Sequence, residues 1–288
     1  MPRKPQPLVI DGHYRYTLSS YEPVSITVTV PYLTEDEVDY GVEEVLCESG
    51  LAEGEHADDA WVRAHVPGVS GTEELARAVR AQLEAINARN ADASRPMLCA
   101  DALAERLEQD VPDEEVAKVK ARLMEDIDAK VRQAGLTLDE ALVGMGMAAT
   151  AVEAMLDAQA RAQAERGAAL DAMADEMGIS VDETELPGLL GTSPKATREL
   201  VADARAHGRL GEVLWRARRN KASASVTAAC SCTYEHESPE QAERRVRMAQ
   251  ERMDNWTMPD GSRPDRPMGP KAGHDGPRPD SRSHLRLV

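Results

Sequence analysis

The sequence contains no phenylalanine, and aromatic residues make up 3% of its 288 residues. Its core must therefore be built from Ala, Leu, Val and Met, and the 42% apolar composition is enough for one large or two ordinary domains. No apolar run approaches the roughly 18 residues of a membrane span, and the N-terminus lacks the apolar region of a signal peptide. We therefore expect a cytoplasmic protein with no membrane partner.

Cysteine is scarce as well, with four residues at positions 47, 99, 230 and 232. Four cysteines are too few for a disulfide framework in a chain of this length, and cytosolic thiols stay reduced. The 34 basic residues are outnumbered by 51 acidic residues, which gives a net charge of −17. This acidic balance argues against a protein that grips a nucleic-acid backbone over a broad face.

The motifs of common catalytic and nucleotide-binding sites are missing too. There is no GxxxxGK followed by Ser or Thr, no GxGxxG after a strand, no HExxH and no GxSxG, and the seven histidines are scattered. We therefore predict no catalytic residue and no cofactor. A basic cluster at residues 218–221 is interpreted as ordinary surface, and a contact with ribosomal RNA is left open.

One weak candidate for a metal site is the group Cys230, Cys232 and His236. A Cys-x-Cys pair followed four residues later by His offers ligands for Zn²⁺ or Cu⁺, but a structural zinc site needs a fourth ligand. The two cysteines could also form a redox pair, or be small buried residues at the end of a helical body. The last interpretation is the simplest, and we predict no metal.

Residues 24–30 alternate apolar and hydroxyl side chains between two prolines, which predicts an edge strand or an extended arm. Helix signals dominate the rest of the chain, so the predicted fold class is mainly α with a short extended β segment near the N-terminus. Caps and apolar stripes predict helices that begin at Thr34, Thr72, near Met97, at Pro112 and at Thr137, a longest helix over 148–177, and a final pair over about 194–204 and 207–219.

These patterns predict four regions. Residues 1–33 form an extended arm or linker with one strand, and residues 34–233 form a helical body. Residues 234–256 form a short polar helix that opens at Ser238 and Pro239. Residues 257–288 are rich in Pro, Gly and charge and have no periodic apolar residues, so we expect them to be disordered.

Two sets of apolar residues recur at helical spacing. Methionine has an unbranched, polarizable side chain that adapts to many apolar partners, and it recurs before and along the predicted longest helix. A second stripe lies on the helix that begins at Thr72. These residues either fill a core without aromatic rings or line a surface that accepts unfolded chains, and the two interpretations are compatible. The candidates are Met145, Met147, Met155, Leu156, Met173 and Met177, and Leu75, Val79 and Leu83.

The order of several short motifs resembles the C-terminal domain of bacterial trigger factor. The motifs are Val111-Pro112-Asp113-Glu114-Glu115-Val116, Gly135-Leu136-Thr137-Leu138-Asp139-Glu140 and the end of the longest helix at Met177-Gly178-Ile179-Ser180-Val181. Each motif is weak alone, and the resemblance rests on their order along residues 20–230. It implies a helical body with arms, as in trigger factor and SurA-like chaperones.

The same resemblance implies an ATP-independent chaperone, a holdase that binds unfolded or nascent polypeptides in a helical cradle through the candidate apolar residues. Trigger factor also carries a ribosome-docking domain and an FKBP-like peptidyl-prolyl isomerase domain. The sequence lacks the docking signature, and the 18 residues between Asp39 and Asp58 leave no room for the isomerase domain. We therefore expect neither ribosome docking nor isomerase activity.

Two alternatives stay open. The chain is a scaffold that reuses the fold for a single partner, or an isomerase family member whose catalytic domain is missing. Alanines at positions 158, 160, 162, 164, 168 and 169 would permit close helix packing in a homodimer. A holdase suppresses aggregation of unrelated proteins, whereas a scaffold binds one partner, so the range of clients distinguishes the two classes.

Overall fold

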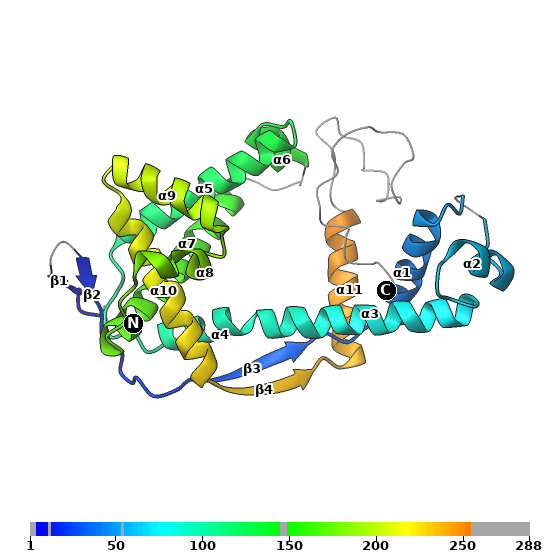
Figure 1. Cartoon of the computed structure of the whole chain (residues 1–288), viewed down its shortest axis with the longest axis horizontal. Helices are drawn as coiled ribbons and strands as arrows, with labels where there is room; N and C mark the ends of the chain where they lie inside the picture. The colour runs from blue at the N-terminus through cyan, green and yellow to red at the C-terminus, as the bar shows by residue number, and fades with distance from the viewer. Residues whose placement is uncertain (1–3, 11–12, 53–54, 145–148, 255–288) are drawn as a thin grey trace. The chain divides into compact units, whose positions relative to one another are not determined.

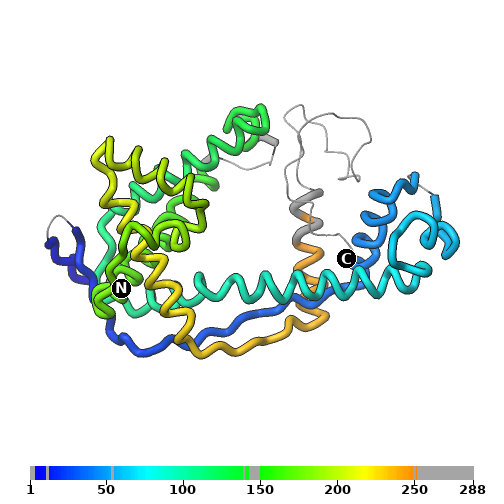
Figure 2. Tube along the Cα trace, in the orientation of Figure 1, coloured from blue at the N-terminus to red at the C-terminus, as the bar shows by residue number. Residues whose placement is uncertain are grey.

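The computed structural model describes residues 4–10, 13–52, 55–144 and 149–254, and its secondary structure is mainly α-helical, as predicted (Figure 1). The chain divides into two compact units. The first takes its described residues from Met1–Val28, Ser94–Val143 and Met147–Thr233, and the second from Thr29–Ala93, Gly144–Gly146 and Tyr234–Val288. Each unit therefore combines stretches that lie far apart in the sequence, as the colours of Figure 2 show.

Helix α7 is the centre of the first unit, because it packs against α4, α5 and α10. The helices of this unit are α4 (Arg95–Ala104), α5 (Asp113–Gln133), α6 (Leu138–Gly144), α7 (Ala149–Glu176), η1 (Glu183–Glu185), α8 (Leu186–Leu190), α9 (Pro194–Ala206) and α10 (Leu210–Ala229). Its strands are β1 (Leu8–Ile10), β2 (His13–Arg15) and the first parts of β3 (Ser25–Val30) and β4 (Ser231–His236).

Alanine makes the close packing of α7 possible. The alanines at positions 160, 164, 168, 169, 172 and 174 are at most 8% exposed. Because a methyl group adds little bulk, neighbouring helices can approach α7 closely in a chain that has no phenylalanine. Most of the alanines that could serve a homodimer are thus already buried within the first unit.

A buried ion pair joins α7 to α10. The Asp171 side chain is 5% exposed and accepts two hydrogen bonds from the guanidinium of Arg219, with Nε to Oδ1 at 2.7 Å. A Cβ on Gly167, one turn earlier, would lie 3.1 Å from Nη1 of Arg219, so the guanidinium fills the space beside this glycine. Burial, and then the negative charges of Glu115 and Asp171, raise the pKa of Tyr16 far above its ordinary value. The Tyr16 hydroxyl therefore stays protonated.

The strand predicted over residues 24–30 is confirmed as β3, whose side chains alternate between exposed and buried positions. It pairs with β4. The bonds from Ser231 N–H to Val24 O and from Glu237 N–H to Val30 O are both 2.9 Å long and have the same offset in sequence, so the strands run parallel, as the arrows in Figure 1 show.

Strands β1, β2 and β4 were not predicted. β1 and β2 have three residues each and form an antiparallel hairpin in which Ile10 lies opposite His13. Three residues are too short to reveal an alternating pattern. β4 follows α10 directly. From the sequence, Ser231 and Cys232 are expected at the end of the helical body, so no strand is expected there.

The second unit contains α1 (Glu35–Glu48), α2 (Asp59–His65), α3 (Thr72–Ala93) and α11 (Pro239–Asp254), with the ends of β3 and β4. Its core consists of Val45, Val62, Val66, Val69, Leu75 and Val79. α1 and α3 approach so closely that a Cβ on Gly41 would lie 2.9 Å from Cγ1 of Val79. Glycine at position 41 therefore permits this helix contact.

The predicted helix starts agree with the structure in most places. Thr34 forms a capping box with Glu37 at the start of α1, Thr137 caps α6, and Ser238 accepts a hydrogen bond from the backbone at the start of α11. The predicted longest helix is α7. Pro112 is the N-cap residue of α5 rather than its first residue, because its ψ of 142° is extended and not helical.

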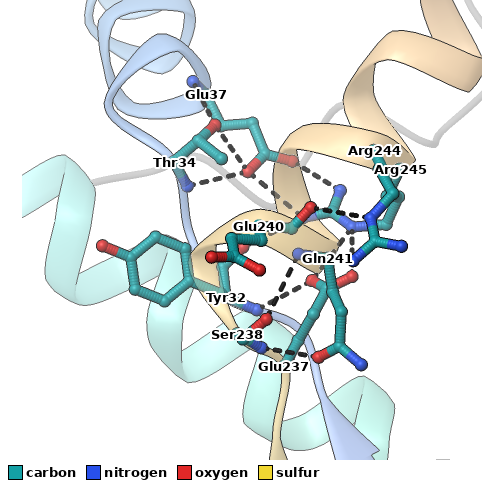
Figure 3. A network of polar contacts seen from close by, with 9 residues as sticks. All are labelled: Tyr32, Thr34, Glu37, Glu237, Ser238, Glu240, Gln241, Arg244 and Arg245. Carbon is teal, nitrogen blue, oxygen red and sulfur yellow. Dashed lines mark hydrogen bonds and ion pairs between the residues drawn. The ribbon is translucent and has the colours of Figure 1, made fainter.

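One arginine holds α11 to the start of α1 within the second unit (Figure 3). Arg245 donates to Glu37 (Nη1 to Oε1, 2.8 Å), to Glu237 (Nε to Oε2, 3.2 Å) and to the carbonyl of Tyr32 (2.9 Å). Burial would raise the pKa of Glu37, but hydrogen bonds from Arg245 and Thr34 outweigh it and lower this pKa. The carboxylate that caps α1 thus also anchors α11.

The units can be compared with the predicted regions. The bounds of the four regions stay a prediction, and the predicted body, residues 34–233, contributes residues to both units. The tail expected to be disordered, 257–288, lies outside the described residues. No helix in the described part of the chain combines the length and the apolar character needed to cross a membrane.

Removing the carboxylate of the buried pair should destabilise the first unit. We expect Asp171→Ala to lower its free energy of unfolding by about 2–3 kcal/mol, because the Arg219 guanidinium loses its charge partner. The expected loss is below that of a fully buried pair, since Arg219 is 37% exposed. Denaturant titration measures it. The control Glu183→Ala removes a surface partner of Arg205 and should cost less than about 1 kcal/mol; equal losses would contradict this account.

Removing Arg245 should release α11. In Arg245→Met, the backbone amides of residues 240–254 should exchange hydrogen on the order of tenfold faster than in wild type, because charge-assisted hydrogen bonds to two carboxylates are lost. Hydrogen exchange read by mass spectrometry measures this change. Arg244→Met is the matched control, since Arg244 donates to the carbonyl of Glu240 in its own helix, at 3.3 Å. An equal increase in both variants would show that Arg245 is not the anchor.

Candidate functional site

Strand β1 exposes three consecutive apolar side chains. Leu8, Val9 and Ile10 are 72%, 60% and 48% exposed, so both faces of the strand carry unburied apolar surface. Within the described residues, β1 is paired in a two-stranded sheet whose other member is β2, so its outer edge has no strand beside it. An apolar strand with one open edge is suited to accept an extended apolar segment of another chain.

Beside this hairpin, α10 contributes a hollow with an aromatic wall. The His13 ring stacks on the Trp215 indole with ring centroids 4.5 Å apart, and the Arg218 guanidinium lies 5.3 Å from the indole centroid. The hollow has a volume of about 250 Å³ and is lined by His13, Val181, Gly211, Leu214, Trp215 and Arg218. Since His13 lies opposite Ile10, the stacked ring connects the hollow to the exposed strand.

Two arginines hold the hairpin and α10 to one carboxylate of α7. Nη1 of Arg15, in β2, lies 2.5 Å from Oδ2 of Asp175, and Nη2 of Arg218 donates to Oδ1 at 2.6 Å. Arg218 also donates to the carbonyl of Ile179 at 2.8 Å. Burial would raise the pKa of Asp175, but the hydrogen bonds and charges of the two arginines outweigh it and lower this pKa. Asp175 is therefore ionised at neutral pH and fixes the hairpin beside the hollow.

The candidate residues of the predicted longest helix divide into two groups. Met155 and Met177 are 50% and 47% exposed, so their thioethers are available to another chain. Leu156 and Met173 are 3% and 8% exposed, and Leu156 packs in a cluster with Leu142 and Val152. The remaining candidates, Met145 and Met147, lie outside the described residues.

The candidate stripe on α3 lies in the core of the second unit. Leu75 and Val79 are completely buried, and the partly buried Leu83 packs against the same cluster. Their helical spacing reflects the packing of α3 against α1 and α2, so in this structure they present little or no surface to a client. We therefore do not retain these three residues as client contacts.

The hairpin and the hollow were not predicted from the sequence, although one signal for the hairpin is present in it. Asp11-Gly12 is a dipeptide typical of a two-residue hairpin turn, and it follows Leu8-Val9-Ile10 directly. Trp215 carried no comparable signal, because its stacking partner His13 lies about 200 positions away in the sequence and no spacing rule relates them.

The described residues contain no group of three or more His, Cys, Asp or Glu side chains that could hold a metal ion. Cys232 and His236 lie four residues apart in the extended strand β4, which separates their Cα atoms by about 13 Å. That Cα separation is too long for the side chains of Cys232 and His236 to bind the same metal ion. Cys230 instead contacts Arg95 and Thr227.

The basic cluster at residues 218–221 is engaged within the first unit. Arg218 and Arg219 bind Asp175 and Asp171, and Lys221 lies 2.7 Å from Glu185 and donates to the carbonyl of Ser180 at 3.0 Å. Asn220 donates to the carbonyl of Leu189 at 2.9 Å. These residues therefore join α10 to α7, η1 and α8.

Residues 72–199 match the family model for the C-terminus of bacterial trigger factor protein. This segment is similar to the trigger factor C-terminal domain. The match supports a general role as a chaperone that binds nascent or unfolded polypeptides. No curated protein matches the chain.

The trigger factor segment includes part of the candidate site. Met155, Met177 and Val181 lie inside the matched range, whereas the β1–β2 hairpin and Trp215 lie outside it. The lining of the hollow thus combines Val181, inside the matched segment, with residues that lie outside it in sequence.

Acid should weaken the first unit through Asp175. The folded-state pKa of Asp175 lies below its ordinary value of 3.8, so its contribution to stability is complete above that value and is lost as the pH falls through the folded-state pKa. The melting temperature of the wild type, measured from about pH 7 to about pH 3, should fall more steeply than that of Asp175→Asn, whose amide does not titrate. Parallel curves would contradict this assignment.

Proposed function

We propose that the protein is an ATP-independent holdase that binds unfolded or nascent polypeptides through exposed apolar side chains of its first unit. The observation that carries this proposal is the open strand Leu8–Ile10 beside the hollow walled by Trp215. An extended client segment can pair with the outer edge of β1 while one of its apolar side chains enters the hollow.

Other exposed apolar side chains of the first unit suit clients of varied sequence. Met155 and Met177 add two exposed, flexible thioethers to the same unit, and such side chains adapt to apolar partners of different shape. Each Leu, Val or Ile that becomes buried against a client contributes on the order of 1–2 kcal/mol. Several such contacts give an affinity that is useful but readily reversed, as a holdase requires.

The proposal places the protein in the cytoplasm, where nascent chains emerge. Its net charge of −17 supports the role, because a strongly charged chaperone repels other copies of itself while it carries an apolar client.

Aggregation of two unrelated denatured enzymes, followed by light scattering without ATP, tests the proposal. The wild type should suppress aggregation of both at a near-stoichiometric ratio. The variant Leu8→Ser/Val9→Ser/Ile10→Ser should need at least roughly tenfold more protein for equal suppression, since it loses more than about 1.4 kcal/mol of contact free energy. Met155→Gln/Met177→Gln should show a smaller loss in the same direction.

The matched control is Ala158→Gln/Glu176→Gln, which changes two exposed positions of α7 without removing a large apolar side chain. It should retain full suppression. If the wild type protects neither enzyme, the holdase proposal is wrong and a scaffold with a single partner becomes the better explanation. If the wild type protects both but the hairpin variant is unimpaired, the holdase stands and the placement of its client surface is wrong.

A further inference from the structure

A second hollow of the first unit, the α9 hollow, is formed by α9 together with η1 and α8. It has a volume of about 320 Å³, and none of its lining residues also lines the hollow walled by Trp215. Part of its lining is apolar, with Pro187 and Val201, and part is charged, with Arg198 and Arg205. The α9 hollow therefore places two cations beside apolar surface.

Caps and prolines hold the frame of the α9 hollow. Ser193 caps α9 by accepting a hydrogen bond from the Ala196 amide at 3.2 Å, and Pro187 and Pro194 fix the backbone in the first turns of α8 and α9. The Thr197 side chain lines the hollow, is 4% exposed as a residue, and donates from its hydroxyl to the carbonyl of Ser193 at 3.0 Å. The hollow is thus already formed, so a ligand need not order it on binding.

The two arginines of the lining lie on one face of α9. They are seven residues apart, which is about 10.5 Å along the helix axis, and Val201 and Ala202 line the hollow between them. Nη2 of Arg205 donates to Oε1 of Glu183 at 2.7 Å, so this guanidinium is fixed against η1. Arg198 is exposed and forms no hydrogen bond or ion pair with any residue that the structure describes. Its charge is therefore available to a ligand.

This lining matches a carboxylate on an aliphatic stem. A guanidinium donates two parallel hydrogen bonds to a carboxylate, and Arg205 already holds the carboxylate of Glu183 in the same lining. Val201 and Ala202 offer apolar surface to the stem of an acidic side chain or to an aliphatic neighbour. A phosphate group, with a charge of about −2, would be repelled by Glu183 more strongly than a singly charged carboxylate.

We propose that the α9 hollow binds acidic segments of other polypeptides, in which Asp or Glu lies beside Leu, Val or Ile. The carboxylate of the segment pairs with Arg198, and the aliphatic neighbour covers Val201 and Ala202. The site is separate from the open strand β1 and does not depend on the proposed holdase activity. It gives a protein with a net charge of −17 a local contact for acidic segments that this charge otherwise repels.

Two matched peptides test the site in NMR titrations of the isotope-labelled full chain. One peptide carries Leu-Glu-Leu between Gly-Ser flanks with both ends blocked, and the other has Gln in place of Glu. The Glu peptide should bind with a Kd on the order of 1 mM and shift the amide signals of residues 183–185 and 195–206. The Gln peptide keeps the shape and loses the charge, so it should bind about fivefold more weakly.

Variants at exposed positions separate charge from shape. Arg198→Gln should weaken binding of the Glu peptide about fivefold and leave the Gln peptide unchanged, because only the charge pair is lost. Ala202→Leu should weaken binding of both peptides, because the larger side chain occupies the hollow. The matched control is Arg216→Gln, since Arg216 is exposed, does not line the hollow and pairs with no described residue. This control loses the same charge and should bind both peptides as the wild type does.

Four outcomes would overturn the proposal. Equal affinity of the wild type for the two peptides would show that the hollow does not recognise a carboxylate, and no shift in residues 195–206 at about 10 mM peptide would show that nothing binds there. An equal loss in Arg216→Gln and Arg198→Gln would assign the effect to overall charge. Tighter binding of a phosphoserine peptide would identify phosphate as the ligand. Failure to suppress aggregation contradicts the holdase alone, because peptide binding is measured directly at the α9 hollow.

Discussion

The buried pair between Asp171 and Arg219 is the constraint on which the first unit depends. A carboxylate removed from water needs a charged and hydrogen-bonded partner, and the guanidinium can reach it because Gly167 leaves room beside α7. One turn further along α7, Asp175 repeats the arrangement with Arg218. Two carboxylates on one face of α7 therefore fix the rotation of α10 about its own axis, and this rotation aims Trp215 and Leu214 into the hollow.

The scarcity of aromatic residues explains both the packing and the candidate surface. A core of alanine and aliphatic residues lets neighbouring helices approach closely. The short side chain of Asp171 can therefore reach its partner on the next helix, which bulky rings between the two helices would prevent. The few large rings are then available elsewhere. Trp215 stacks on His13 at the edge of the first unit, and Trp61 stacks on His65 in the second. The first stack joins β2 to α10, whereas Trp61 and His65 both belong to α2.

The sequence predicted the helices well, because caps and apolar stripes are local signals: Thr34, Thr137 and Ser238 begin helices as expected. The sequence predicted the candidate site less well, because apolar residues have the same helical spacing whether they pack in a core or contact a client. Leu75 is completely buried and Met155 is half exposed, yet both follow helical spacing. Which stripe is covered depends on contacts between distant segments, and a single sequence does not record them.

Three basic residues of α10 are paired inside the first unit. The three cations at residues 218–221 looked like a positive patch in the sequence, but all three are paired with acids of α7 and η1. Pairing these cations internally leaves the excess of acid, −17 for the whole chain, as the charge that acts on the surroundings. Like charge opposes association of copies of the protein through the exposed side chains of Leu8, Val9 and Ile10. Each internal pair takes up one positive and one negative charge, so the net charge of −17 is the same with or without the pairs that order α10.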